Sequence, residues 1–389
     1  MDALHTAIWP FQAAWTLAVW ACASRFVRPR ADAPWLVGGH RGREREDNGK
    51  ALHDELLREG RAALWIADRK LEKRLREEGV PVLRRNSLAA KLAILRAPVL
   101  AYSHGEDDLD PFLRYRKKGL GLRVLLNHCV QQLKSSGLFS REARALPPRA
   151  REKLRKSQVD FDLLPAISPS EKATFELRFG KEAADRILPF GGGAHLDAFR
   201  AMPKAVDGRL IVWFPTWRDT ASGRDELREA IEAVAFSEPL RKHLRERGME
   251  LAIVRHINSK DAGLASDDLV SFRSPSEIVP LLGKACCFVS DYSSLIVDWL
   301  LLDRPFVLFA PDEERYERER GFFNRPSDLG FGPVARTAGE LVDLIVSGKW
   351  RDVAPYAEAR LRRKREFFPD PMPDSFAKST VEAILSRLP

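Results

Sequence analysis

CCFVSDYSSLIVDWLLLDRPFVLF, residues 286–309, holds two short apolar runs separated by a polar turn and a helical stretch. Residues 286–290 and 306–310 have the length and composition of buried strands, and residues 293–302 those of a helix. A strand, a helix and a second strand in this order form a βαβ unit with parallel strands. The stretch therefore predicts an α/β fold with a parallel, doubly wound sheet.

The same alternation continues on both sides of this stretch. Further strands are predicted at 35–39, 62–68, 98–104, 122–128, 210–216, 250–256 and 269–272, and helices at 52–60, 225–247 and 276–284. Because 389 residues exceed what one core usually supports, two domains are expected. Glycines 191–193 and Pro203 put the boundary near 202–208, which gives domains at 31–202 and 203–389.

Residues 1–30 form a separate N-terminal segment, mostly apolar from residue 8 to 27 and followed by arginines. Its polar residues make it marginal as a spanning helix, and the missing basic start argues against a cleavable signal. Trp9 and Trp20 lie three helical turns apart on one face, as in an interfacial anchor. We expect a membrane-associating helix, with a packed helix or a true span as alternatives.

The net charge of +9 is concentrated in clusters, chiefly 141–156 and 360–365. Such clusters suit anionic lipid head groups or phosphodiesters, and are equally typical of solvated helix faces. No nucleic-acid-binding module is recognisable, so no nucleic-acid partner is expected. The four cysteines have no C-x-x-C spacing, which favours a reduced, cytosolic protein.

Open α/β sheets bind ligands beyond the carboxyl ends of their strands. Histidines follow three predicted strands, at His104, His128 and His256, and polar residues follow two others at 216–219 and 290–294. These residues are the candidates for a site.

The turn at 291–294 precedes a predicted helix, whose first N–H groups and positive dipole end attract anions. Ser293 and Ser294 add hydroxyl donors for a phosphate. The alternative is plain helix capping by Ser and Asp.

Residues 277–323 read EIVPLLGKACCFVSDYSSLIVDWLLLDRPFVLFAPDEERYERERGFF. This run resembles the CDP-glycerol glycerophosphotransferase family, which includes teichoic-acid primases and polymerases. The matching positions are Asp291 to Ser294, Asp298, Arg304-Pro305, Asp312, Tyr316 and Arg320 to Phe322. FPTWRD (214–219), Asp47-Asn48 and residues 167–180 also match, so the resemblance covers most of 36–378.

The chain departs from the family pattern in three places. The W-H-G-x-x-x-K-x-x-G element appears as NHCVQQLKSSG (127–137), which keeps His128 and Lys134 but has Asn127 and Cys129. A P-R-x-D element survives only as Asp197, and His256 is followed by isoleucine instead of proline. The donor pattern is intact, and the acceptor pattern is altered near 127–137.

The resemblance implies two Rossmann-like domains in a GT-B arrangement, with donor in the C-terminal domain and acceptor at the N-terminal one. An acceptor hydroxyl would attack the phosphorus that bears glycerol in CDP-glycerol and release CMP. One alternative is a GT-B glycosyltransferase that uses a nucleotide sugar. Another is a non-catalytic nucleotide-binding relative at the membrane.

Site roles follow from the matched positions. His128 is the expected base, because an imidazole with a pKa near 6.5 accepts protons at neutral pH, although a strand-end histidine can be merely hydrogen-bonded. His256 is the second catalytic candidate. The donor phosphates and nucleotide are assigned to Ser293, Ser294, Asp291, Arg218, Thr216, Asp298, Asp312 and Tyr316, and the acceptor side to Lys134, Asp47 and Asn48.

Two of these assignments have structural alternatives. Arg218 suits a bidentate phosphate contact, and equally an ion pair with Asp219 or a surface carboxylate. Asp298 would face the site one turn into the helix, or orient Arg218 or Arg304.

No cofactor or metal is expected, because the carboxylate pairs 107–108 and 267–268 are interpreted as solvated loop residues. The expected partners are a CDP-activated alditol donor, a lipid-linked glycan acceptor and an anionic membrane surface. The expected location is the cytoplasmic face of the bacterial membrane, with peripheral or monotopic attachment.

Overall fold

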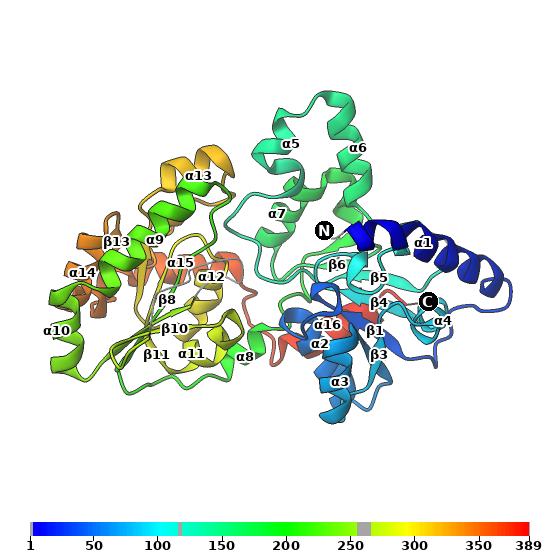
Figure 1. Ribbon diagram of the computed structural model, residues 1–389, viewed down its shortest axis with the longest axis horizontal. Coiled ribbons are helices and arrows are strands. Elements are labelled where there is room, and N and C mark those ends of the chain that lie inside the picture. Colours follow the sequence, from blue (N-terminus) through cyan, green and yellow to red (C-terminus); the bar gives the residue numbers. More distant parts are fainter. Residues whose placement is uncertain (1–2, 116–118, 255–265, 389) are drawn as a thin grey trace. The chain divides into compact units, whose positions relative to one another are not determined.

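The computed structural model describes residues 3–115, 119–254 and 266–388, and the chain forms two compact α/β units (Figure 1). The first unit comprises Met1–Val130, Pro147–Asp197 and Pro369–Pro389, and the second comprises Gln131–Leu146 and Ala198–Phe368. Each unit is built on a parallel sheet. The predicted α/β class with parallel sheets is confirmed.

The two units are made of different segments of the chain from the predicted domains at 1–30, 31–202 and 203–389. The N-terminal helix and residues 369–389 belong to the first unit, and residues 131–146 belong to the second. Contacts of Asp197 hold the C-terminal segment 369–389 against the first unit. The Asp197 carboxylate accepts hydrogen bonds from Ser375 Oγ and from the N–H groups of Phe376 and Ala377, at 2.7–2.9 Å. These bonds hold the start of the last helix, α16 (Phe376–Leu385), which packs on α2 (Asp47–Arg58) of the same unit.

The sheet of the first unit has the order β3-β2-β1-β4-β5, and all its pairs are parallel. Its strands are β1 Trp35–Gly38, β2 Ala63–Ala67, β3 Val82–Arg84, β4 Val99–Tyr102 and β5 Leu122–Leu125, and a separate pair is β6 Leu164–Pro165 with β7 Ile187–Leu188. The helices are α1 Ala3–Ala23, α2 Asp47–Arg58, α3 Arg69–Glu77, α4 Leu88–Arg96, α6 Pro148–Gln158, α7 Pro169–Phe179 and α16 Phe376–Leu385. The four predicted strands are present.

Successive side chains of β1 point to opposite faces of the sheet and contribute to the two hydrophobic cores of the first unit. Leu36 packs into a cluster with Ile94 of α4 and Phe175 of α7, and Val37 packs into a second cluster with Leu52 of α2. Both strand residues are fully buried. Helices therefore cover both faces, as a parallel sheet requires.

The second sheet has the order β10-β9-β8-β11-β12-β13 and is also parallel throughout. Its strands are β8 Leu210–Phe214, β9 Glu250–Val254, β10 Val270–Arg273, β11 Ala285–Ser290, β12 Phe306–Phe309 and β13 Val334–Ala335. The helices are α5 Arg141–Ala145, α9 Ala221–Ala235, α10 Glu238–Arg247, α11 Ile278–Lys284, α12 Leu295–Trp299, α13 Glu313–Glu319, α14 Ala338–Ser347 and α15 Ala357–Phe367, and α8 Leu196–Arg200 lies at the boundary. The predicted helix 225–247 is two helices, because Ser237 caps a new start at α10.

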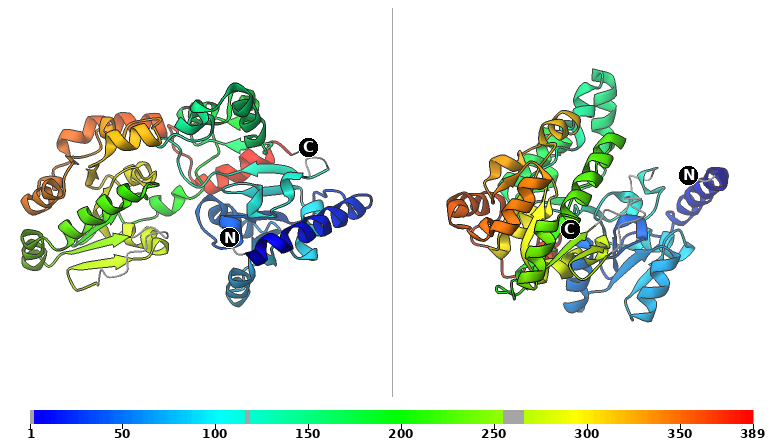
Figure 2. Two further views of the ribbon diagram at one scale, coloured as in Figure 1. Left: turned by 45° about the horizontal axis from the view of Figure 1, so that its top comes forward. Right: turned by 60° about the vertical axis from the view of Figure 1, so that its left-hand side comes forward.

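Helix α1 lies at the surface of the first unit (Figure 2), but its Trp20 is in the core. Trp20 is 1% exposed, and its Nε1–H donates to the Lys91 carbonyl of α4 at 3.3 Å. The prediction that Trp20 faces a membrane is therefore wrong, and the side chain of Trp9 lies outside the described residues. Among the residues that the structure describes, no helix is long and apolar enough to cross a membrane.

Beneath Trp20, Lys91 and Asp110 form an ion pair of 2.8 Å with side chains 2% and 1% exposed. Lys91→Met is expected to lower the free energy of unfolding by about 3–5 kcal/mol, because Asp110 stays buried without its cation. The double variant Lys91→Met/Asp110→Asn should recover most of the loss, since no charge remains. Urea denaturation measures both, with Lys73→Met on the surface as control. Equal stability of Lys91→Met and the control would contradict the assignment.

Candidate active site

The strand order of each sheet reverses once, between β1 and β4 in the first unit and between β8 and β11 in the second. In open α/β sheets, the crevice at such a reversal is the preferred place for a ligand. The loops after these strands carry most of the predicted site residues. Each unit therefore offers its own candidate site.

Three histidines gather at the carboxyl edge of the first sheet. His40 follows β1, His104 follows β4 and His128 comes shortly after β5. The rings of His104 and His128 are stacked, with centroids 4.7 Å apart and planes 10° apart. The rings of His40 and His104 have centroids 4.2 Å apart. The predicted base His128 is thus part of a cluster.

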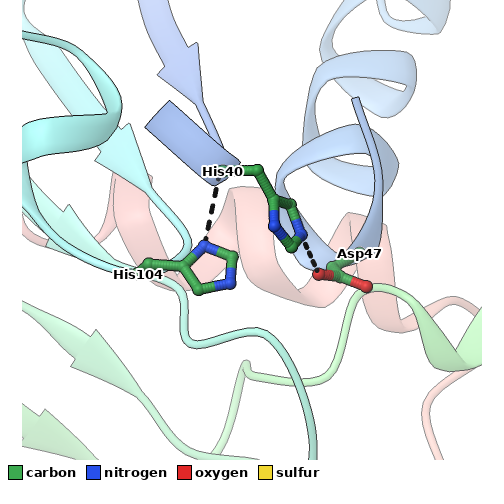
Figure 3. A group of neighbouring side chains, drawn as sticks. All are labelled: His40, Asp47 and His104. Atoms are coloured by element: carbon green, nitrogen blue, oxygen red, sulfur yellow. Dashed lines mark hydrogen bonds and ion pairs between the residues drawn. The ribbon is translucent and has the colours of Figure 1, made fainter. Parts of the chain in front are cut away.

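Asp47, at the start of α2, supplies a negative charge to this cluster. Its Oδ2 accepts a hydrogen bond from His40 Nε2 at 3.1 Å (Figure 3). Burial raises the pKa of Asp47, but the hydrogen bond from His40 and attraction to His128 and His195 outweigh burial and lower the pKa. Burial likewise opposes the charge of His40, but Asp47 raises the pKa of His40 above its usual value. Asp47 thus interacts with three histidines.

Asn48, the neighbour of Asp47, ties the cluster to two other loops. It is 2% exposed, and its Nδ2–H groups donate to the carbonyls of Leu126 and Asn127, both at 3.2 Å. Its Oδ1 accepts the backbone N–H of His195 at 2.9 Å. The side chain therefore positions α2 against the loop that carries His128.

The backbone is strained around the same residues. His40, Arg41, Asp47 and Asn127 have φ values of 48°, 56°, 56° and 60°. Positive φ costs side-chain-bearing residues free energy and concentrates at functional sites. Asn127 replaces the family tryptophan, and asparagine tolerates this conformation better than most residues. Asparagine in place of the family tryptophan at position 127 is therefore compatible with the local backbone conformation.

The burial of Asp108 was not predicted from the sequence. Predicted as a solvated loop residue, it is 1% exposed and accepts hydrogen bonds from the N–H groups of Arg41 and His104, both at 2.8 Å. It therefore joins the loops after β1 and β4. His40 was also missed, although it directly follows the predicted strand 35–39, and the rule applied to His104 would have found it.

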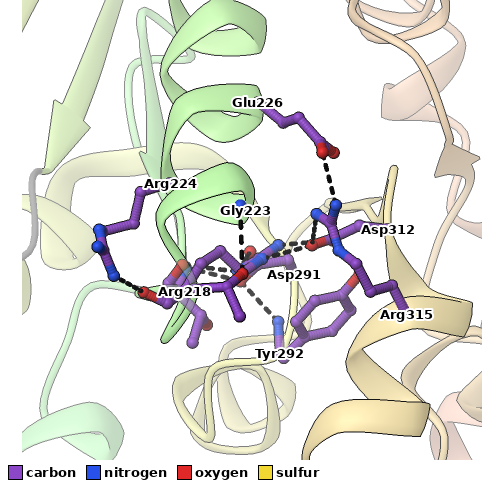
Figure 4. Close-up of polar contacts among 10 residues, drawn as sticks. Arg218, Gly223, Arg224, Glu226, Asp291, Tyr292, Asp312 and Arg315 are labelled. Atoms are coloured by element: carbon purple, nitrogen blue, oxygen red, sulfur yellow. Dashed lines mark hydrogen bonds and ion pairs between the residues drawn. The ribbon is translucent and has the colours of Figure 1, made fainter.

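Arg218 organises the carboxyl edge of the second sheet (Figure 4). Its side chain is 3% exposed, and Nε and Nη2 donate to the two Asp312 oxygens at 2.7 and 2.8 Å. Nη1 donates to the Thr216 carbonyl at 2.6 Å and pairs with Asp291 Oδ2 at 2.9 Å. One guanidinium thus joins the loops after β8, β11 and β12.

These contacts give Arg218 a structural role. All three guanidinium nitrogens are engaged by buried groups, so Arg218 positions loops, and neither Asp219 nor a surface carboxylate is its ion-pair partner. Burial opposes the charges of Arg218 and Asp312, but Asp291 and Asp312 raise the pKa of Arg218, and Arg218 lowers that of Asp312. Contact of Arg218 or Asp312 with the donor phosphates or nucleotide stays a prediction.

Aromatic rings complete this network. Arg218 lies 4.7 Å from the Tyr292 ring centroid and 5.3 Å from that of Tyr316. Tyr292 donates its hydroxyl to Asp312 Oδ1 at 2.8 Å, and Tyr316 stacks on Phe322. Tyr316 is 2% exposed and packs inside the unit, and its predicted contact with a nucleotide stays a prediction.

Hydrogen bonds of its own side chains hold the turn 291–294 in place. Asp291 Oδ1 accepts the backbone N–H groups of Thr216 at 2.8 Å and of Tyr292 at 2.6 Å. Ser293 Oγ accepts the Leu295 N–H at 3.3 Å, whereas the side chain of Ser294, the N-cap residue of α12, makes no capping hydrogen bond. Ser294 is partly exposed and Asp298 is fully buried. Phosphate binding by the two serines stays a prediction, as does the role of Asp298.

Lys134 lies in the second unit, although it was assigned to the acceptor-side domain 31–202. Its segment pairs with the R-G-F element: the Phe323 N–H donates to the Leu133 carbonyl at 2.6 Å, and Ser135 N–H donates to the Gly321 carbonyl at 3.0 Å. The element 127–137 therefore divides, with His128 in one unit and Lys134 in the other. His256 lies outside the described residues.

Asp312→Asn is expected to destabilise the protein by about 3 kcal/mol at pH 7, because it breaks the buried pair with Arg218. The folded-state pKa of Asp312 lies below its unfolded value of about 3.9, so the pair stabilises above roughly pH 4. This stability is lost as the pH falls through the folded-state pKa.

The difference in unfolding free energy between wild type and Asp312→Asn should therefore shrink below about pH 4. Denaturant titrations from pH 7 to pH 3 measure it, with Asp328→Asn, at an exposed residue of the η8 turn (Pro326–Leu329), as the matched control. A difference that stays constant across this range would contradict the pairing.

Relatives among characterised proteins are teichoic-acid enzymes. The teichoic acid ribitol-phosphate primase of Bacillus spizizenii is 22% identical over 80% of this chain and 82% of its own length. The teichoic acid glycerol-phosphate transferase of Staphylococcus aureus is 24% identical over 78% and 81%. The teichoic acid poly(ribitol-phosphate) polymerase of Bacillus spizizenii is 28% identical over 38% of this chain, which matches only 24% of that polymerase's length.

A solved structure of the wall teichoic acid polymerase TagF is similar over 99% of this chain and 94% of that chain, with a TM-score of 0.64 and 17% identity. This likeness concerns the fold. A family model described as CDP-glycerol:poly(glycerophosphate) glycerophosphotransferase matches residues 27–370. The chain therefore belongs to the CDP-glycerol:poly(glycerophosphate) glycerophosphotransferase family.

Proposed function

We propose that this protein transfers glycerol phosphate, or a related alditol phosphate, from its CDP-activated form to a lipid-linked acceptor in the synthesis of a cell-envelope polymer. Family membership and the teichoic-acid primases and transferases among its relatives support this reaction class. The observation that carries the proposal is the cluster of His128, His104, His40 and Asp47 at the carboxyl edge of the first sheet.

His128 acts as the general base in this proposal. The acceptor hydroxyl oxygen bonds to the phosphorus that bears the alditol, and the phosphorus–oxygen bond to CMP breaks. CMP leaves with the bonding electron pair, and the hydroxyl proton passes to a ring nitrogen of His128. The nearby charge of Asp47 stabilises the imidazolium that forms.

The second unit binds the donor in this proposal. Phosphoryl transfer depends mostly on positioning and electrostatic stabilisation, and the Arg218 network fixes the loops 216–219 and 291–294 at the strand-order reversal. We assign Ser293, Ser294 and nearby backbone N–H groups to the pyrophosphate. We extend this to a GT-B arrangement, in which the acceptor binds the first unit.

Membrane attachment in this proposal is peripheral and involves α6. This helix has no buried residue, and Arg149, Arg151, Lys153 and Lys156 are all exposed. Basic side chains near a surface gain about 1 kcal/mol each from anionic lipids. With Trp20 buried, α6 is a better candidate for this contact than the Trp20 face of α1.

The test is release of CMP from CDP-glycerol by purified protein given a glycerol-phosphate-primed lipid acceptor. Wild type should release CMP only with acceptor present, and His128→Ala should lower kcat by about 10²–10⁴-fold, because the base is lost. His243→Ala, a histidine of α10 outside the cluster, is the control. Thermal melting of each variant separates lost chemistry from lost folding.

Other outcomes favour the rival functions. Release of UDP or GDP from a nucleotide sugar, without CMP release, would replace the proposal with a glycosyltransferase. Binding of CDP-glycerol without turnover on any lipid-linked acceptor would indicate a non-catalytic relative. Full activity of His128→Ala would remove His128 from the mechanism.

A further inference from the structure

His40, Asp47 and His104 offer ligand atoms that all lie within 4.8 Å of one another (Figure 3). They come from the loop after β1, the start of α2 and the loop after β4. The proton transfer proposed for His128 uses none of their ring nitrogens. We propose that these three side chains bind one divalent transition-metal cation.

The pair His40 and Asp47 already has the spacing of two adjacent ligands. His40 Nε2 and Asp47 Oδ2 are 3.1 Å apart. A cation about 2.1 Å from each atom would see them at an angle of roughly 95°, between octahedral and tetrahedral geometry. The cation would replace the proton that the two atoms now share.

His104 has a carboxylate beside one of its ring nitrogens, which suits binding of a cation through the other nitrogen, Nε2. The His40 backbone N–H donates to His104 Nδ1 at 3.4 Å, and this nitrogen lies 3.5 Å from Asp108 Oδ2. A metal-binding histidine usually donates its other N–H to a carboxylate, which fixes the tautomer. In the tautomer that binds a cation through Nε2, the proton is on Nδ1, which then donates to Asp108 instead of accepting the His40 N–H.

The surrounding contacts hold the ligands in place before any cation binds. Asp108 accepts the N–H groups of Arg41 and His104, and so joins the two histidine loops. Asn48 fixes the start of α2, which carries Asp47. His40 and Asp47 both have positive φ, a strained conformation that these contacts maintain.

The donor set selects the class of cation. Two imidazoles and one carboxylate suit first-row transition metals such as Mn²⁺, Co²⁺ and Zn²⁺, whereas Mg²⁺ and Ca²⁺ prefer oxygen ligands. His40 also lies near Glu44 and Glu46, but that group has only one imidazole. Three protein ligands leave positions open for oxygen atoms, beside the ring of His128. On the proposed function, an acceptor hydroxyl oxygen would occupy one of them, and the cation would make that hydroxyl more acidic, which offsets the loss of the Asp47 charge beside His128.

The test uses Co²⁺ with the full-length, untagged, chelator-treated protein. Titration should give one Co²⁺ per chain, visible absorption without a near-ultraviolet thiolate band, and a raised melting temperature. Asp47→Asn and His104→Ala should each weaken binding at least about 10-fold, and Asp108→Asn about 10–100-fold. Glu44→Gln and His243→Ala should leave the affinity within about twofold.

Equal affinity in Asp47→Asn, His104→Ala and wild type would show adventitious binding only and overturn the proposal. A thiolate band would assign the cation to a cysteine and overturn it too. Melting without added cation confirms that each variant is folded. Binding is measured without substrate, so this test and the test of the transferase reaction can fail independently.

Discussion

The parallel direction of the strands is the constraint on which the rest of the structure depends. Because the strands of each sheet pair in parallel, the loops that follow them collect at one edge. Each loop carries polar groups that must be satisfied, and adjacent loops must be held against one another. The two units meet this requirement with different chemistry.

In the second unit, one buried guanidinium holds three loops. Arg218 is shared by Asp291 and Asp312, and stripping water from three charges is costly unless the pairing is nearly complete. In the first unit the loops are joined by Asp108 and Asn48, largely through backbone N–H and carbonyl groups. The imidazoles of His40 and His104 lie on either side of the reversal of strand order, after β1 and β4.

The sequence predicts the parts of this arrangement that depend on local pattern. Strands such as β8, β11 and β12 appear as apolar runs of the right length, and the carboxyl-end rule finds His104 and His128. The sequence pattern does not reveal β3, which is only three residues long. Nor does it show that α16 packs on the first unit, an arrangement that depends on Asp197. Apolarity alone could not distinguish a membrane face of α1 from one that packs on α4.

Assignments of partners were the least predictable feature of the site. Residue type suggested a phosphate for Arg218, but the distance of 94 residues along the chain to Asp312 hides their pairing. Asp108 looked solvated because nothing local signals the loop that covers it. Lys134 lies on the second unit because its backbone pairs with residues 321–323, a contact between segments far apart in sequence.

The central claim is that His128 removes the proton during transfer and takes no part in donor binding. The most direct measurement is single-turnover transfer of labelled glycerol phosphate from CDP-glycerol to a lipid-linked acceptor, with calorimetric binding of CDP-glycerol measured alongside. For His128→Asn the account predicts a transfer rate at least about 100-fold lower and a donor Kd within about twofold of wild type. An unchanged transfer rate, or a loss explained entirely by weaker donor binding, would contradict it.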